Sequence, residues 1–115
     1  MEVIERKEGP VTILTLQARY IGAAEAGHIM DTLHELRERG EKSIVIDLGP
    51  VQTMNSSGLG ALISGLNTMR LAGGEIKLTG VNEKVDKLLT ITKLHSVFES
   101  FASVKEAVES FAGLA

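Results

Sequence analysis

The stretch from Met54 to Arg70, MNSSGLGALISGLNTMR, places two adjacent serines where a loop gives way to a helical pattern. Large apolar side chains then recur every three or four residues, which predicts an amphipathic helix. They are Leu59, Leu62, Ile63, Leu66 and Met69. Asn55 or Ser56 is a suitable N-cap for this helix. Ser57 then falls in the first turn, where backbone N–H groups and the helix dipole favour a negative charge.

Three glycines lie within the same predicted helix, at positions 58, 60 and 65. A glycine in a helix interior costs about 0.8–1.0 kcal/mol relative to alanine, so each one needs a reason. One reason is access, because a partner's backbone can approach Ser57 where no side chain intervenes. The other is close packing of the helix on its own sheet. The spacing alone does not choose between them.

Strands and helices alternate on both sides of this stretch. Glu2–Lys7 and Val11–Leu16 alternate in character about a Gly9–Pro10 turn, which predicts a β-hairpin. Further strands are predicted over Ser43–Leu48, Glu75–Thr79 and Val97–Phe101. Further helices are predicted over Ala23–Arg39 and after the N-caps Asn82 and Ser103. This order predicts a single α/β domain over residues 1–115, with a mixed sheet of four or five strands.

Composition narrows the classes of function. The chain has 115 residues, 43% of them apolar, and no cysteine, which excludes disulfides, thiolate zinc sites and a cysteine nucleophile. The net charge of −3 and the few aromatic residues argue against nucleic-acid binding. The N-terminus is charged and alternating, unlike a secretory signal, and no apolar run approaches a membrane span. We therefore expect a cytoplasmic protein without a membrane partner.

The serine stretch resembles the signature of the STAS domain, in its bacterial anti-sigma factor antagonist branch. That signature runs apolar-Asp-Ser-Ser/Thr/Ala-Gly-Leu-Gly and continues into an amphipathic helix. SIVIDLGPV, at residues 43–51, resembles the strand that precedes the signature. Residues 73–108 resemble the downstream half of the family. The resemblance implies a small mixed sheet with about four helices packed mainly on one face.

The same resemblance implies a function and a set of residues. Ser57 is the expected phosphoacceptor, with Ser56 as the alternative. The implied partners are an ATP-using serine kinase that also acts as an anti-sigma factor, and a phosphatase. The unphosphorylated protein is expected to bind the kinase and free a sigma factor, and phosphorylation is expected to end that binding. The expected partner-binding residues are Arg19, Tyr20, Asn55, Ser56, Gly58, Leu59, Gly60 and Ala61.

Two departures from the family pattern bear on this expectation. Asn55 stands where the family usually has Asp, which removes a negative charge beside the phosphoacceptor. Residues 18–21 read ARYI where the family loop resembles Gly-Glu-Leu-Asp, so an arginine replaces an acid. The alternative function is a STAS interaction module that does not switch, either a scaffold subunit in stress signalling or a partner of a lipid transporter.

The residues give little support for an enzyme. No base is evident for Ser57, and His28, His34 and His95 lack the context of a catalytic triad. The glycine-rich SSGLGALISG lacks the lysine and spacing of a phosphate-binding loop. His28, Asp31, Thr32 and Glu35 share a helix face, but no second cluster completes a metal site. Asp47 is interpreted as a structural hydrogen-bonding residue. We expect no catalysis, no cofactor and no metal.

Overall fold

The computed structural model describes residues 1–113 and begins with the predicted hairpin. Strands β1 (Glu2–Glu8) and β2 (Val11–Gln17) pair antiparallel from Glu2 opposite Gln17 to Glu8 opposite Val11. Gly9 turns the chain between them with a φ of +58°, a conformation that glycine adopts without steric cost. The hairpin forms one edge of the sheet.

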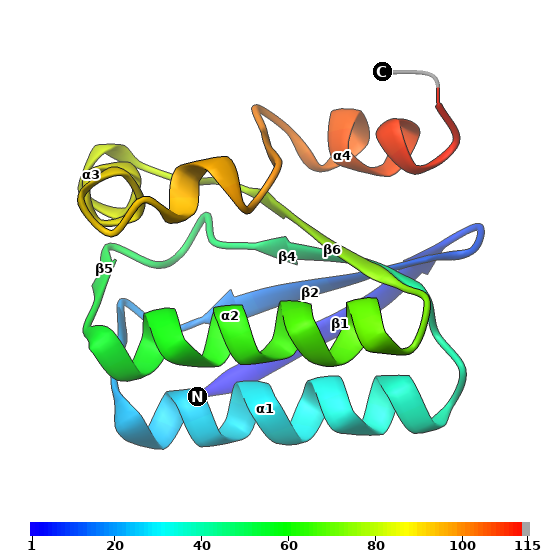
Figure 1. Cartoon of the computed structure of the whole chain (residues 1–115), viewed down its shortest axis with the longest axis horizontal. Helices are drawn as coiled ribbons and strands as arrows, with labels where there is room; N and C mark the ends of the chain where they lie inside the picture. Colours follow the sequence, from blue (N-terminus) through cyan, green and yellow to red (C-terminus); the bar gives the residue numbers. More distant parts are fainter. Residues whose placement is uncertain (114–115) are drawn as a thin grey trace.

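Five strands make up the main sheet, in the order β1-β2-β4-β6-β7 (Figure 1). Strands β4 (Ser43–Asp47), β6 (Glu75–Thr79) and β7 (Ser100–Phe101) run parallel to β2. The prediction of a mixed α/β sheet is therefore confirmed. The last strand is shorter than the predicted Val97–Phe101, because residues 94–96 form a 3₁₀ turn, η1, and Phe98 turns into the core.

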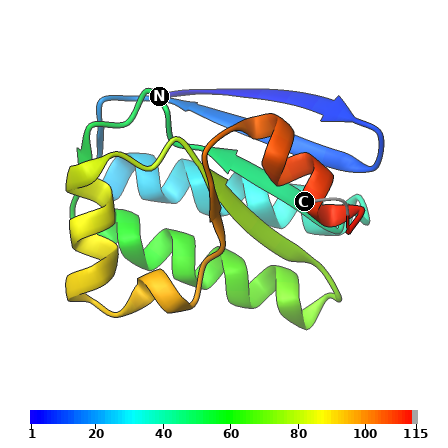
Figure 2. The ribbon, with the colours of Figure 1, turned by 90° about the horizontal axis from the view of Figure 1, so that it is seen from above.

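Helices α1 (Ala23–Glu38) and α2 (Ser56–Leu71) lie side by side over one face of the sheet, and both begin at the same end (Figures 1 and 2). Their buried side chains join those of the sheet in the main core. From α1 these are Ala26, Ile29, Leu33 and Leu36, and from α2 they include Leu62, Leu66 and Met69. Both helices therefore bury the apolar stripe that the sequence predicts.

Helix α3 (Glu83–Ile91) lies at one end of this layer and adds Val85 and Leu89 to the main core. Helix α4 (Val104–Phe111) instead covers the opposite face of the sheet, as Figure 1 shows. It closes a second, smaller core that includes Val11, Ile13, Val45 and Ala107. Asn82 and Ser103 cap the two helices as predicted. Within residues 1–113, no helix combines the length and the apolar character needed to cross a membrane.

A two-stranded sheet forms where the sequence predicts only loops. Strand β3 (Tyr20–Ile21) pairs parallel with β5 (Thr53–Met54). β3 follows β2 and β5 follows β4, so both continue from the carboxyl ends of neighbouring parallel strands. The small sheet leads the chain into α1 on one side and into α2 on the other.

The loops after β4 and β6 meet in close contact at the same end of the sheet. The Leu48 N–H donates to the Thr79 carbonyl over 2.8 Å. A Cβ added at Gly80, which has a φ of +73°, would lie 2.4 Å from the Gly49 nitrogen. Asp47 accepts a hydrogen bond from the Gly49 N–H over 2.9 Å, which confirms its structural interpretation. The backbone at this end of the sheet is therefore tightly packed and has little conformational freedom.

Candidate functional site

Asn55 fixes the start of α2. Its Oδ1 accepts hydrogen bonds from the Ser57 N–H at 2.9 Å and the Gly58 N–H at 3.1 Å. Its backbone carbonyl accepts from the Leu59 N–H over 3.1 Å, which is the first bond of the helix. Ser56 and Ser57 follow in the first turn, and both are exposed. The structure therefore places the Ser57 hydroxyl at an exposed helix N-terminus.

The three glycines of α2 have different surroundings. A Cβ at Gly58 would lie 2.9 Å from the Ile21 carbonyl oxygen, and one at Gly65 would lie 2.3 Å from Cδ1 of Leu33. These two glycines allow close packing on β3 and on α1. A Cβ at Gly60 would meet no atom of residues 1–113 within 4 Å. Of the three glycines of α2, Gly60, one turn beyond Ser57, is the one that packing among residues 1–113 does not explain.

The expected partner-binding residues divide by exposure. Gly58, Leu59 and Ala61 are buried, Leu59 and Ala61 at 8% and 5% exposure, because the α2 backbone presses against β3 and the core. In this conformation Leu59 and Ala61 expose little side-chain surface to a partner, and Gly58 has no side chain. The remaining expected residues lie on or close to the surface. They are Arg19, Tyr20, Asn55, Ser56 and Gly60.

The segment from Gln17 to Gly22 borders the start of α2. The Asn55 N–H donates to the Ile21 carbonyl over 3.1 Å, and the Gln52 N–H donates to the Arg19 carbonyl over 2.8 Å. Tyr20 is 50% exposed, and its ring rests beside Gly22. Arg19 and Tyr20 thus share an edge of the molecule with Ser57.

Glu25 carries the negative charge at the start of α1, on the same edge. Its Oε1 accepts from the Gly22 N–H over 2.9 Å. This hydrogen bond holds the pKa of the Glu25 carboxyl below its ordinary value of 4.5, and the backbone N–H of Glu25 itself adds to the effect. The first turn of α2, by contrast, contains no acidic residue. The two neighbouring helix starts therefore differ in charge.

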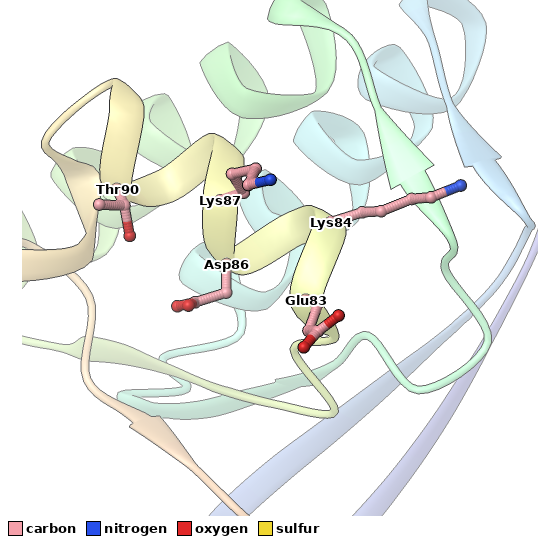
Figure 3. Close-up of a pocket in the computed structure, with 5 residues that line it drawn as sticks. All are labelled: Glu83, Lys84, Asp86, Lys87 and Thr90. Carbon is pink, nitrogen blue, oxygen red and sulfur yellow. The ribbon is translucent and has the colours of Figure 1, made fainter.

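Helix α3 borders this edge on the other side. A shallow hollow of about 410 Å³ lies on its outer surface, lined by Glu83, Lys84, Asp86, Lys87 and Thr90. Figure 3 shows the two lysines on one side of the helix and the two acids on the other. On this open surface the positive and negative side chains point in different directions and do not converge on a common point that could hold an ion (Figure 3). Within the described part of the chain, no three histidine or acidic side chains gather to hold a metal ion.

Comparison with known proteins places this geometry in a family. A family model described as the STAS domain matches residues 3–107. The chain belongs to the STAS domain family. A protein of Thermotoga neapolitana, named as a candidate anti-sigma factor antagonist, is 29% identical over 79 residues, which are 69% of this chain and 70% of that protein.

Solved structures of other proteins share the fold. The crystal structure of a candidate anti-sigma factor antagonist from Thermotoga maritima has a TM-score of 0.84 at 24% identity, covering 94% of this chain and 92% of that one. The Bacillus cell fate determinant SpoIIAA in its phosphorylated form has a TM-score of 0.74 at 14% identity, covering 96% and 99%. At these identities the likeness concerns the fold alone, and it confirms the predicted architecture.

One feature of the site escaped sequence reasoning. The Asn82 side chain, predicted only as a helix cap, also donates from Nδ2 to the carbonyls of Val51 and Gln52, both at 3.1 Å. These contacts join α3 to the loop that precedes Ser57. The only sequence signal was the choice of asparagine, because serine, threonine or aspartate caps a helix without offering two N–H donors.

Proposed function

We propose that this STAS protein is an anti-sigma factor antagonist controlled by phosphorylation of Ser57. In its unphosphorylated form it binds a serine kinase that is also an anti-sigma factor, and so frees a sigma factor in the cytoplasm. It acts by binding, without catalysis or a cofactor of its own. The observation that carries the proposal is the exposed Ser57 hydroxyl in the first turn of α2, one turn from the open Gly60.

The phosphoryl transfer belongs to the kinase. Ser57 Oγ forms a bond to the γ-phosphorus of ATP, the bond from that phosphorus to the bridging oxygen of ADP breaks, and the hydroxyl proton passes to a base of the kinase. The product carries about −1.5 to −2 charges at pH 7 and three strong acceptor oxygens. A helix N-terminus accommodates that charge, so the antagonist keeps its fold.

The same phosphate spoils an interface. On a surface kept smooth by Gly60, it introduces bulk together with a charge whose burial without a partner is costly. We assign the contact surface to Arg19, Tyr20, Asn55, Ser56 and Gly60, which border Ser57 and remain accessible. Phosphorylation therefore ends binding by changing the contact surface, with no movement of the backbone required.

Mass spectrometry after incubation with ATP and the anti-sigma kinase that is proposed as the partner tests this function. We expect one phosphate, on Ser57, and no modification of Ser57→Ala. Ser57→Ala should stay bound to the kinase in the presence of ATP, and Ser57→Asp should bind weakly. Modification of Ser56 alone moves the site by one residue. Absence of any modification favours the STAS interaction module that does not switch.

Arg19 marks where this surface departs from the family pattern. An exposed arginine steers association with an acidic patch, so we expect Arg19→Glu to slow association with the kinase, most clearly at low ionic strength. Surface plasmon resonance at two salt concentrations measures this change, and Arg37→Glu, at the far end of α1, is the matched control. Equal association rates for the two variants remove Arg19 from the interface.

A further inference from the structure

Residues 49–54, here called the presenting loop, carry the chain from the end of β4 to the N-cap of α2. Val51 anchors this loop in the main core at 1% exposure, whereas the neighbouring Gln52 is exposed. On one side, the N–H groups of Gln52 and Thr53 donate to the Arg19 carbonyl at 2.8 and 3.2 Å. This side ties the presenting loop to the segment before α1.

Asn82 ties the other side. Its Nδ2 donates to the carbonyls of Val51 and Gln52, both at 3.1 Å, while its Oδ1 accepts from the Val85 N–H at 2.9 Å. No other side chain of residues 1–113 donates to those two carbonyls. An amide side chain of this length can cap the helix and donate twice at the same time, which a hydroxyl or a carboxylate cannot do. The Asn82 side chain therefore joins the presenting loop to the first turn of α3 by hydrogen bonds.

The contacts continue from the presenting loop to Ser57. Asn55, three residues after Gln52, donates from its backbone N–H to the Ile21 carbonyl and accepts from the Ser57 N–H with its side chain. Hydrogen bonds from Asn82 therefore hold one side of the loop, and hydrogen bonds to the Arg19 carbonyl hold the other. Asn55 links the end of the loop to the first turn of α2, so the position of the loop determines that of the helix start. Loss of either set of hydrogen bonds leaves the loop held by the other set and by the buried Val51.

We propose that Asn82 is a positioning residue for Ser57, fixing the presenting loop so that the hydroxyl meets the kinase in one geometry. This inference rests on the proposed function. Transfer of a phosphoryl group depends steeply on the placement of the attacking oxygen, and a displacement of about 1 Å can cost about a hundredfold in rate. The hydrogen bonds of the Asn82 side chain go to Val51, Gln52 and Val85 and not to Ser57, so its effect on the hydroxyl passes through the loop.

Two variants separate this role from simple helix capping. Asn82→Asp and Asn82→Thr both keep an oxygen that can cap α3. Neither offers the pair of N–H donors to Val51 and Gln52. Asp adds a charge and Thr does not, so an effect that appears only with Asp is electrostatic and overturns the inference. Ser103→Ala, which removes the cap of α4 on the far face of the sheet, is the control for a general loss of stability.

Amide hydrogen exchange on the isolated protein is the first test, and it needs no kinase. We expect both Asn82 variants to speed exchange at Gln52, Thr53 and Asn55 by about tenfold, the scale set by losing two ordinary hydrogen bonds. The helical amide of Leu89 should change much less. Unchanged exchange in the loop, or an equal increase throughout α3, overturns the positioning role whatever the function of the protein.

Kinetics of Ser57 phosphorylation, with the purified kinase and ATP, is the second test. We expect kcat to fall about tenfold in both Asn82 variants with KM within twofold, because the docking surface remains and the hydroxyl is less well placed. Ser103→Ala should change neither constant. If the wild type is not phosphorylated, the proposed function fails and the exchange result still decides whether Asn82 fixes the loop. Faster loop exchange with an unchanged kcat overturns the inference alone.

Discussion

At the scale of single residues, the glycines of α2 show how one residue type serves two purposes. Gly58 and Gly65 sit where any side chain collides with a neighbouring element, whereas a side chain at Gly60 would meet only open space among the described residues. The first two glycines stabilise the fold by allowing close approach. Gly60 destabilises its helix, and such a cost is expected where a small residue is retained for function rather than for stability.

This contrast predicts opposite effects of the same substitution. Gly60→Ala should raise the unfolding free energy by about 0.8–1 kcal/mol, because alanine is the better helix former and meets no obstacle. Gly65→Ala makes the same helical gain, but its Cβ presses on the fully buried Leu33 and overpacking costs about 1–3 kcal/mol, so the unfolding free energy should fall by up to about 2 kcal/mol. Urea denaturation of the two variants beside the wild type gives both values.

Binding to the kinase tests whether Gly60 leaves space for a partner. If a partner's backbone approaches there, Gly60→Ala should weaken binding to the kinase although it stabilises the free protein. Gly27→Ala in α1 is the matched control, because that glycine is also exposed and open within residues 1–113. Equal affinity for the two variants would show that Gly60 lies outside the interface.

Glu25 gives a dependence of stability on pH. The folded state lowers its pKa through the Gly22 N–H, so its contribution is present above the ordinary value of 4.5 and is lost as the pH falls through the lower folded value. We expect Glu25→Gln to flatten part of the acid side of the stability curve. Chemical denaturation from pH 7 to pH 3 measures this. A curve parallel to that of the wild type would contradict the prediction.

At the scale of elements, α4 is held around a lysine. Lys77 of β6 is 8% exposed, donates to Ser110 Oγ at 2.8 Å, and lies 4.4 Å from the centre of the Phe111 ring. Its Nζ lies 3.7 Å from a carboxylate oxygen of Glu99, a side chain that is 65% exposed. A charged group therefore occupies the middle of a small apolar contact.

The balance at Lys77 predicts tolerance to an apolar replacement. The hydrogen bond and the cation–π contact stabilise by about 2 kcal/mol each, whereas removing the ammonium from water costs several kcal/mol. Lys77→Met, which keeps the length of the side chain, should leave the unfolding free energy unchanged or raise it by about 1 kcal/mol. Lys77→Ala should lower it by about 2–3 kcal/mol, because it leaves a cavity beneath α4.

Calorimetry or urea denaturation distinguishes these outcomes. A loss in Lys77→Met as large as that in Lys77→Ala would mean that the charge itself holds α4 in place. Lys105→Met, on the exposed side of α4, is the control for removing a positive charge without disturbing the contact.

Elements with strong periodicity could be predicted from the sequence, and elements made by tertiary contact could not. The stripe from Leu59 to Met69 predicts α2, and the asparagine before the serines suits its cap. Strands β3 and β5 have two residues each, which is too short for any alternating pattern, and they exist because β2 and β4 deliver their loops to one place. The hydrogen bonds from Asn82 to the presenting loop could not be predicted either, because they also depend on tertiary contact.

At the scale of the whole molecule, the two faces of the sheet are covered by different helices. Helices α1 and α2 cover one face and begin at the end where the candidate contact surface lies, and α4 seals the other face with its own small core (Figure 2). The main core runs from the β-hairpin to α3 beneath that surface. Such a platform lets the charge of the surface change while the backbone stays in place.

A negative charge at Ser57 should therefore act with opposite signs on folding and on binding. Ser57→Asp places a carboxylate in the first turn of α2, where the helix dipole favours it by about 0.3–1 kcal/mol, so the free protein should melt at the same temperature or slightly higher. Its affinity for the kinase should fall by tenfold or more, because the interface must bury that charge. Ser64→Asp, two turns further along the exposed side of α2, gains nothing from the helix start. Scanning calorimetry and isothermal titration on the two variants give both signs. A Ser57→Asp variant that unfolds more easily would mean that the switch works by disturbing the fold, and one that binds as tightly as Ser64→Asp would place the partner elsewhere.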